Sequence, residues 1–180
     1  MNRPLIFRII EERSLGYLKD LIENGYNINV RDDKNRTALH LAVSNYHMSK
    51  LLVENGADLN ATDLEGFKPI DFFKADLGSK ENILLCDLFL SHGSDIESRN
   101  RLSKTLLHRA VCKEDYELIE FLLKKGADPN AVQKKHIGRK YYENTILCTA
   151  IDKYQEPTEE MKEIIKLLIE YGAEGRYPRS

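Results

Sequence analysis

The sequence has few cysteines, no long apolar run and almost no net charge, and each shortage excludes a class of protein. Its three cysteines, Cys86, Cys112 and Cys148, form neither a CxxC pair nor the even set of a disulfide-rich secreted domain. No stretch reaches the roughly 20 apolar residues of a membrane-spanning helix. The short apolar run near the N-terminus is broken by Arg8, so it lacks the core of a signal peptide. We therefore expect a cytoplasmic protein with reduced thiols and no membrane association.

Charge of one sign and catalytic motifs are also scarce. There are 27 Lys and Arg against 29 Asp and Glu, a formal net charge of -2, so no general positive field attracts a nucleic acid. The motifs GxxxxGK[ST], GxGxxG, HExxH and GxSxG are all missing. The sequence therefore predicts a protein that is not an enzyme and that has no metal site and no cofactor.

What the sequence does contain is internal repetition. Five segments end alike, with two apolar residues, two mostly polar residues and a glycine, which is typical of a helix ending at a left-handed C-cap. A second block precedes each ending and opens a shorter helix. The pattern therefore predicts that each repeat contains two helices and a connector. The cap glycines are Gly25, Gly56, Gly93, Gly126 and Gly172, and the opening blocks PLIFRII, TALHLAV, KPIDFFK, TLLHRAV and TILCTAI start at Pro4, Thr37, Lys68, Thr105 and Thr145.

The spacing of these blocks separates a constant part from a variable part. From a cap glycine to the next opening block the distance is 12 residues three times, and 19 residues between Gly126 and Thr145. From an opening block to its own cap glycine it varies between 19 and 27 residues. We expect connectors with a defined turn structure and helix junctions that tolerate insertions. Three of the second helices are expected to begin at a capping side chain, Ser14, Asp115 or Thr158.

The blocks GADLNA, GADPNA, TALHLA and TLLHRA resemble the ankyrin repeat, which has about 33 residues, a TPLH opening and a GADVN ending. The resemblance covers nearly the whole chain and implies an all-α fold, an ankyrin-repeat solenoid of helix-turn-helix units joined by β-hairpin-like connectors. It implies a single domain over residues 1–180, with repeats near 3–30, 31–61, 62–97, 98–131 and 132–175. The irregular repeat lengths are similar to those of stand-alone ankyrin proteins of large DNA viruses and intracellular bacteria that act on host proteins.

Two histidines are candidates for a metal ligand or a catalytic base, but the resemblance implies a structural role for both. His40 and His108 occupy the fourth place of their opening blocks, where ankyrin repeats use histidine for hydrogen bonds between repeats. Asp71 and Cys148 fill that place in two other repeats, so no shared metal site is expected.

Connector tips and inner helices are the surfaces on which ankyrin proteins usually bind a partner, so the resemblance implies binding there. Exposed apolar residues at such tips act as anchors beside orienting arginines, unless they pack on adjacent connectors instead. We predict a scaffold or adaptor that binds another protein through its concave face and connector tips and is monomeric on its own. The candidate contact residues of these connectors and inner helices are Arg36, Leu64, Phe67, Arg101, Leu102, Lys104 and Lys113.

The connector over residues 132–144 is seven residues longer than the others and mixes basic with aromatic residues. Such a mixture binds an acidic peptide or, alternatively, a nucleic acid through phosphate contacts and base stacking. The near-neutral protein around loop 133–142 favours a protein partner over a nucleic acid, and a passive solvated loop is the other alternative. The candidate contact residues in this loop are Lys134, Lys135, Arg139, Tyr141 and Tyr142.

Asn60 and Asn130 each follow a cap glycine by four residues. They match the asparagine that a cytosolic oxygenase hydroxylates in some ankyrin proteins, so the resemblance implies two candidate modification sites. The alternative is that both side-chain amides satisfy backbone groups in the turn after the cap.

Overall fold

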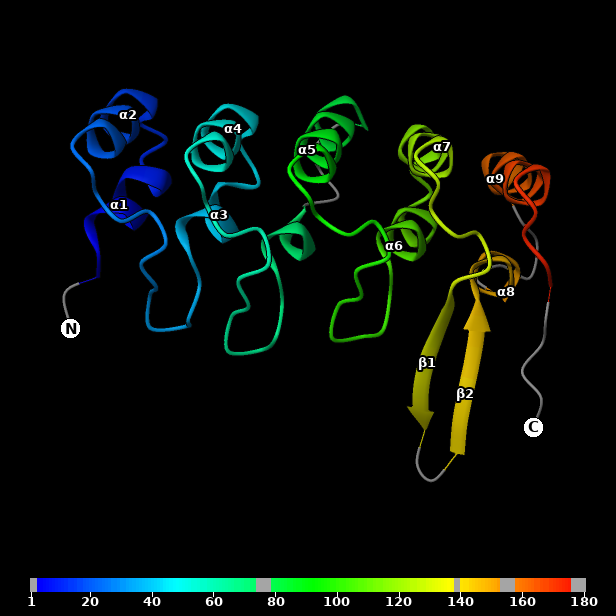
Figure 1. Ribbon diagram of the computed structural model, residues 1–180. Helices are drawn as coiled ribbons and strands as arrows, with labels where there is room; N and C mark the ends of the chain where they lie inside the picture. Colours follow the sequence, from blue (N-terminus) through cyan, green and yellow to red (C-terminus); the bar gives the residue numbers. More distant parts are fainter. Residues whose placement is uncertain (1–2, 74–78, 138–139, 153–157, 176–180) are drawn as a thin grey trace. The chain divides into compact units, whose positions relative to one another are not determined.

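The computed structural model describes residues 3–73, 79–137, 140–152 and 158–175 (Figure 1). The chain forms two compact units, Met1–Ser94 and Asp95–Ser180. Each unit is built from pairs of helices joined by connectors, and the described residues are mainly helical, as predicted.

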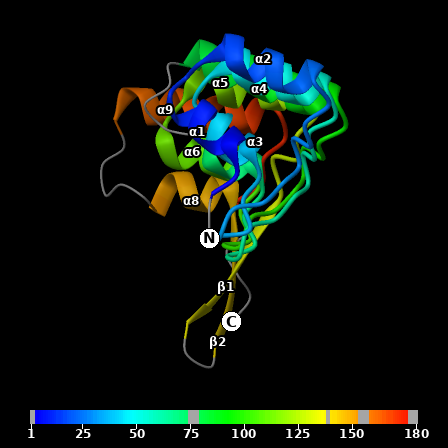
Figure 2. The same cartoon turned by 90° about the vertical axis from the view of Figure 1, so that its left-hand side faces the viewer.

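The first unit contains three of the predicted repeats. Its helices form two rows, with α2 and α4 in one row and α1 and α3 in the other, and α1 packs on α3, α2 on α4 and α4 on α5 (Figures 1 and 2). Apolar side chains on the facing sides make the core, among them Phe7, Leu18, Leu39, Leu52 and Phe89, which are fully buried. The elements are α1 (Leu5–Glu11), α2 (Leu15–Glu23), α3 (Ala38–Ala42), α4 (Tyr46–Glu54), the 3-10 helix η1 (Pro69–Phe72) and α5 (Ser79–Ser91).

The second unit contains two repeats and a two-stranded antiparallel sheet. Helix α6 packs on α7 and α8, and α9 packs on α7 and α8. Its core includes Leu107, Ile119, Leu122, Ile146 and Ile164. The elements are α6 (Leu106–Lys113), α7 (Tyr116–Lys124), β1 (Val132–Ile137), β2 (Lys140–Thr145), α8 (Ile146–Asp152) and α9 (Glu159–Glu170).

The helix ends follow the predicted caps. All five cap glycines have a positive φ, from 74° at Gly25 to 92° at Gly93, which is the left-handed conformation that glycine adopts without strain. Asp115 and Thr158 accept the backbone N–H of the third residue of their helices, as predicted. Ser14 precedes α2 but its side chain makes no capping bond, so that part of the prediction is wrong.

The third repeat departs from the predicted helix at its opening block. The structure has a single 3-10 turn there, fixed by Pro69 at the first helical position and by the Asp71 carboxylate, which accepts the Lys68 N–H at 3.0 Å. Phe73 then leaves the helical conformation, with φ -56° and ψ 119°, and its ring packs edge-on against Phe89 with centroids 5.5 Å apart. The helix thus ends after one turn, at the residue whose ring packs on α5.

Candidate protein-binding surface

The three 12-residue connectors contain the same turn, built around one acceptor side chain. Asp32, Asp63 and Asn100 each stand seven residues after a cap glycine, and Oδ1 of each accepts two backbone N–H groups, from the residues two and four positions later. A backbone hydrogen bond closes each turn as well, because the N–H of its first residue donates to the carbonyl of the residue four positions later. The side-chain bonds run from Lys34 and Arg36 (3.0 and 2.9 Å), from Glu65 and Phe67 (2.8 and 2.9 Å) and from Leu102 and Lys104 (2.9 and 3.1 Å).

The fourth residue of each turn adopts a left-handed conformation. Its φ is 61° at Asn35, 81° at Gly66 and 57° at Ser103. Asparagine and glycine tolerate this region, whereas serine is strained in it. The three turns thus share one backbone shape despite unlike sequences, which explains the constant spacing of 12 residues.

Two arginines that the sequence analysis missed join adjacent connectors. Arg31 Nη1 donates to the carbonyl of Asn35 in its own turn at 2.9 Å and to that of Thr62 at 2.8 Å. Arg99 Nη1 does the same, to Ser103 at 3.1 Å and to Val132 at 2.6 Å. Both arginines stand six residues after a cap glycine, and this shared position is the signal that identifies them.

Side-chain amides also join neighbouring repeats at the fourth residue after the cap glycine. Asn29 donates to the Gly56 carbonyl and accepts the Asp58 N–H. Asn130 donates to the Gly172 carbonyl at 2.8 Å and accepts the Glu174 N–H at 2.7 Å. The Asn130 amide therefore satisfies backbone groups, but of the next repeat rather than of its own turn. Asn60 is exposed, and hydroxylation of either asparagine stays a prediction.

His40 joins two repeats, as the resemblance implies. Its Nδ1 accepts the Thr37 N–H at 3.0 Å, so the proton of the neutral ring is on Nε2, which faces the Phe67 carbonyl at 3.2 Å. Burial lowers the pKa of His40, because a charged imidazole loses its hydration inside the protein.

His108 occupies the same position in the second unit but is less well satisfied. Its Nδ1 accepts the Thr105 N–H, while the buried Nε2 has no hydrogen-bond partner among the described residues. The nearby Asn144 backbone raises the pKa of His108, but it does not meet the geometry of a hydrogen bond to Nε2. Burial, followed by the charges of Arg99 and Lys104, lowers the pKa of His108 to about 4. Both histidines are thus neutral structural groups near pH 7.

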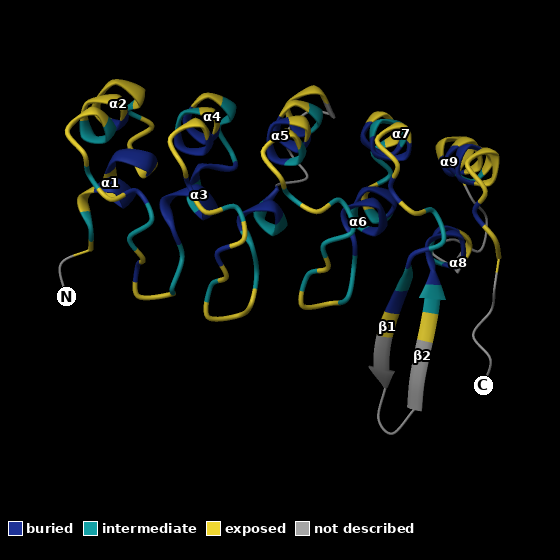
Figure 3. Cartoon of the chain, viewed as in Figure 1, coloured by how far each residue is buried: buried dark blue, intermediate teal, exposed yellow. Residues whose placement is uncertain are grey.

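Five of the predicted contact residues are exposed. Leu64 is 73% exposed and Leu102 is 58% exposed, and both are residues of the turns described above. The ends of the short connectors are coloured as exposed in Figure 3. Arg101, Lys113 and Lys134 are exposed as well. Leu64 and Leu102 therefore do not pack away on adjacent connectors, which was the alternative for these side chains.

The side chains of three other predicted contact residues are engaged within the protein. Arg36 binds the buried Asp32 carboxylate through Nε at 2.9 Å and Nη2 at 2.7 Å. Phe67 is partly buried against Phe72, and Lys104 Nζ donates to Cys112 Sγ at 3.0 Å. These side chains therefore have less surface to offer a partner.

The long connector is a β-hairpin rather than an irregular loop. Strands β1 and β2 pair in antiparallel register, with Val132 opposite Thr145 and Lys134 opposite Glu143. Lys135, Tyr141 and Tyr142 lie within these strands, but their side chains are outside the described residues, as is the whole of Arg139. The hairpin thus takes the place of the turn that an Asp or Asn side chain closes in the other connectors, which we call the Asx turn.

The described residues lack two other kinds of feature. No cluster of three His, Cys, Asp or Glu side chains is arranged to hold a metal ion in that part of the chain. Among the same residues, none of the helices has the length and apolar character needed to cross a membrane.

Comparison with known proteins identifies the repeat. A family model described as ankyrin repeats, in three copies, matches residues 6–85 and again 77–177. The chain is 28% identical over 115 residues to a putative ankyrin repeat protein of fowlpox virus, covering 63% of this chain and 26% of that protein. It is 30% identical over 124 residues to an ankyrin repeat protein of variola virus, covering 63% of this chain and 22% of that protein.

A further relative comes from an animal. Ankyrin repeat and SOCS box protein 6 of Pongo abelii is 32% identical over 124 residues, covering 63% of this chain and 29% of that protein. The chain thus spans less than a third of the length of each of these relatives. Because the family model matches most of the sequence and the helix pairs follow its repeats, the chain belongs to the ankyrin repeat family.

Proposed function

We propose that the protein is a non-catalytic scaffold or adaptor that binds a partner protein through the tips of its connectors. Ankyrin repeats are general protein-interaction modules and are typically not enzymatic. The observation that carries the proposal is the exposure of two leucines, Leu64 and Leu102, on turns whose backbone is fixed by hydrogen bonds. An apolar side chain held at a rigid tip binds without a large loss of chain entropy.

The surroundings of each leucine support this role. In the first unit the Leu64 N–H donates to the Lys34 carbonyl at 3.0 Å, so the second tip is braced against the first. In the second unit the Leu102 carbonyl accepts from the Gln133 amide at 2.9 Å. Arg101 and Lys134 are exposed charged groups on the same connectors as Leu102 and Gln133. Apolar anchors with charged neighbours are typical of binding sites for proteins.

The partner is proposed to be a protein in the cytoplasm, and a host protein if this chain is itself viral, as two of the proteins it is similar to are. Nucleic acid is not proposed as the partner, because Lys134 is paired across the hairpin with the exposed Glu143 and the formal net charge of the chain is -2.

The test is affinity capture from the cells in which the protein is made. The double variant Leu64→Asp and Leu102→Asp should lose the specific partner that the unchanged protein captures. The matched control is Leu84→Asp, because Leu84 is also an exposed leucine but lies on α5, away from the connector tips. All three proteins should have the same helix content and melting temperature.

Two results would contradict the proposal. If capture survives the double variant, the connector tips are the wrong surface. If Leu84→Asp loses the partner as completely as the double variant does, binding depends on exposed apolar residues in general rather than on the connector tips.

A further inference from the structure

A segment of the second unit carries charge of a single sign. Residues 98–113, which include most of the third short connector and all of α6, contain five Lys or Arg and no Asp or Glu. The equivalent segments, counted from the preceding cap glycine, contain three basic and two acidic residues over 30–45, and two basic and four acidic residues over 61–76. We call residues 98–113 the basic segment, and its charged residues are Arg99, Arg101, Lys104, Arg109 and Lys113.

The turn of the third connector adds no negative charge to this segment. The first turn is closed by the carboxylate of Asp32, which also pairs with Arg36 Nη2 at 2.7 Å, whereas the third turn is closed by the uncharged amide of Asn100. Lys104 holds the position of Arg36 in the third turn. Its Nζ donates to Cys112 Sγ at 3.0 Å, so it meets a thiol where Arg36 meets a carboxylate.

The solvent-facing side of α6 continues the basic surface. Five residues of this helix are buried in the core, and Arg109 and Lys113, four residues apart, lie on the side that is left to solvent. In the second repeat the equivalent residues, Leu41 and Asn45, are uncharged. The bond of Lys104 to the residue before Lys113 brings the connector to the same end of the helix. Connector and helix thus contribute basic groups to one surface.

The buried histidines report the difference in charge between the repeats. Burial lowers the pKa of His40 and of His108 alike. At His40 the largest effect of a charged residue comes from the Asp63 carboxylate and raises the pKa. At His108 it comes from Arg99 and then from Lys104, and lowers the pKa. The electrostatic potential is therefore more positive at α6 than at the equivalent helix of the first unit.

An exposed apolar side chain lies within the basic segment. Leu102 is 58% exposed and follows Arg101 directly, on the turn that Asn100 closes. A protein segment offers carboxylates and apolar side chains together, whereas the backbone of a nucleic acid offers phosphates alone. Leu102 therefore favours a protein as the occupant of this surface.

The rest of the second unit is acidic. Outside the basic segment, residues 95–180 contain 11 Lys or Arg and 15 Asp or Glu. A nucleic acid that extends beyond the basic segment would be repelled there, because its charge is spread along its whole length. The surroundings thus favour a short acidic stretch of protein over a polyphosphate.

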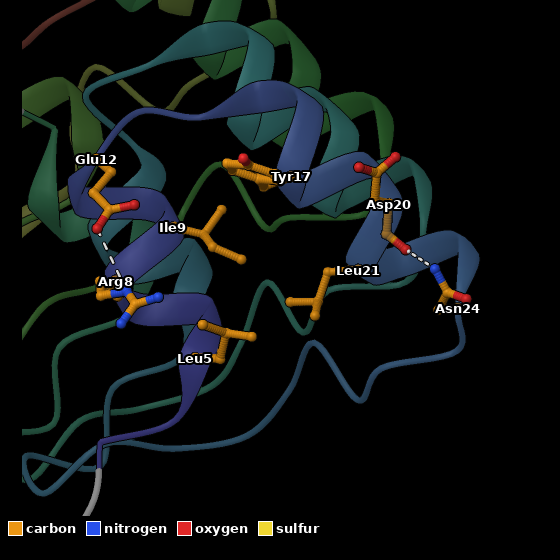
Figure 4. A pocket seen from close by; sticks show the side chains of 8 residues that line it. All are labelled: Leu5, Arg8, Ile9, Glu12, Tyr17, Asp20, Leu21 and Asn24. Carbon is orange, nitrogen blue, oxygen red and sulfur yellow. Dashed lines mark hydrogen bonds and ion pairs between the residues drawn. The ribbon is translucent and has the colours of Figure 1, made fainter.

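The hollow between α1 and α2 shows no such preference. Its volume is about 410 Å³, and Arg8 and Glu12 from α1 lie on one side of it with Asp20 from α2 on the other (Figure 4). Arg8 Nε pairs with a Glu12 carboxylate oxygen at 3.4 Å. Charges of both signs line this hollow, so charge selects no occupant for it.

We propose that the basic segment binds an acidic segment of the partner protein, with carboxylates against Arg101, Arg109 and Lys113 and an apolar side chain against Leu102. The inference rests on the proposed function and names the chemistry that the partner offers. Charge complementarity identifies the occupant, because the segment has five basic residues and no acidic one. Complementary charges of this kind orient a partner and speed its association.

The test is selection of peptides from a random display library on the immobilised full chain. The recovered peptides should contain more Asp and Glu than the unselected library. The double variant Arg109→Glu and Lys113→Glu should recover peptides without this excess. It should also bind a recovered acidic peptide about tenfold more weakly, because two exposed attractive charges become repulsive.

The matched control makes the same change of charge elsewhere in the second unit. Lys124→Glu and Lys166→Glu alter exposed lysines of the outer helices α7 and α9, and this variant should recover the same acidic peptides as the unchanged chain. Circular dichroism should show equal helix content in both double variants. The milder pair Arg109→Gln and Lys113→Gln should weaken peptide binding less than the glutamates do.

Three results of these binding measurements would overturn the inference. The first is a selection that recovers no peptide, or peptides without an excess of Asp and Glu. The second is equal weakening by the control variant. The third is a labelled single-stranded oligonucleotide that displaces the recovered peptide and binds more tightly than it does, which would identify a nucleic-acid surface.

Affinity capture separates this inference from the proposed function. A partner that is lost by the double variant Leu64→Asp and Leu102→Asp but kept by Arg109→Glu and Lys113→Glu would overturn the acidic contact and leave binding through the connector tips intact. The reverse result would support the acidic contact and contradict binding through the tips.

Discussion

The first three connectors and the fourth begin at the same distance from a cap glycine but fold differently. The seventh residue after the glycine is Asp32, Asp63 or Asn100 in the short connectors and Gln133 in the long one. The shorter side chains close a turn on their own backbone, whereas the Gln133 amide donates to the Leu102 carbonyl of the neighbouring connector. The side chain of Gln133 is one methylene group longer than that of Asp or Asn. It bonds to the neighbouring connector instead of closing a turn on its own backbone.

The two kinds of connector have different effects on the histidine that each one covers. Phe67, whose carbonyl faces Nε2 of His40, ends an Asx turn, while Asn144 holds the equivalent position at the end of the hairpin. The hairpin leaves Nε2 of His108 without a hydrogen bond among the described residues. The regular turn therefore satisfies its histidine and the hairpin does not.

The largest expected effect comes from removing the carboxylate of the first turn. Asp32→Ala takes two acceptor bonds from the turn and leaves Arg36 without its buried partner, and should lower the unfolding free energy by about 3–4 kcal/mol. Asn100→Ala removes the same turn bonds without an ion pair and should cost about 1–2 kcal/mol. Urea unfolding monitored by circular dichroism measures both values.

A third variant distinguishes the two contributions at Asp32. Asp32→Asn keeps the acceptor oxygen of the turn and removes the charge, so its loss should fall between the other two. Equal losses in Asp32→Ala and Asn100→Ala would show that the ion pair with Arg36 adds nothing to the turn.

The second prediction concerns pH and His108. The pKa of this histidine falls from 6.5 to about 4 on folding, so the unfolded chain binds more protons between these values and stability declines as the pH is lowered from 6.5 to 4. At about 1.4 kcal/mol per pH unit the full loss is on the order of 3 kcal/mol. Urea midpoints at pH 7 and pH 4.5 measure the decline.

The matched comparison uses substitutions that do not titrate. His108→Gln should flatten the decline between pH 6.5 and 4 more than His40→Gln does, because burial and the charges of Arg99 and Lys104 lower the pKa of His108 to about 4, whereas at His40 the bond to Phe67 is the first effect after burial and opposes it. A steeper dependence on His40 would mean that the hairpin connector satisfies His108 as well as the turn satisfies His40.

The third prediction addresses the support of the hairpin. Gln133→Ala removes the donor to the Leu102 carbonyl and should cost about 1 kcal/mol, because one hydrogen bond is lost and Leu102 lies at the surface, where water can replace the donor. Hydrogen exchange of the β1 amides should become faster while that of α7 stays unchanged. Unaltered exchange in β1 would show that the strand pairing alone holds the hairpin.

The smallest effects are expected at the left-handed residue of the turns. Ser103→Gly should gain about 0.5 kcal/mol, because relief of the strain exceeds the added entropy of the unfolded chain. Gly66→Ala should lose about 1 kcal/mol from strain alone, since an added Cβ at Gly66 meets no atom within 4 Å. Melting temperatures measure both changes, and shifts of the same sign would contradict a shared turn.

The sequence allowed prediction of the features that depend on neighbouring residues. The cap glycines, the capping side chains of Asp115 and Thr158 and the fixed length of the short connectors follow from local backbone chemistry, and all were confirmed. The third repeat was predicted less well, because its helix ends where the Phe73 ring packs on Phe89, a residue distant in sequence.

The candidate site was predicted as a region rather than residue by residue. Charge and position favoured Arg36 as a contact residue, but its binding to the buried Asp32 depends on the folded turn. Arg31 and Arg99 were missed because the carbonyls they bind belong in part to another connector. The sequence alone does not distinguish exposure of Leu64 and Leu102 from packing on adjacent connectors, because that depends on the folded turns, and both side chains are exposed.

The most direct test of the central claim is photo-crosslinking from the connector tips in living cells. A photoreactive amino acid is placed at position 64, 102 or 84, and the covalent products are identified by mass spectrometry. Binding through the tips predicts that positions 64 and 102 crosslink to the same protein and that position 84 does not. Crosslinks to that protein from position 84 alone would contradict it.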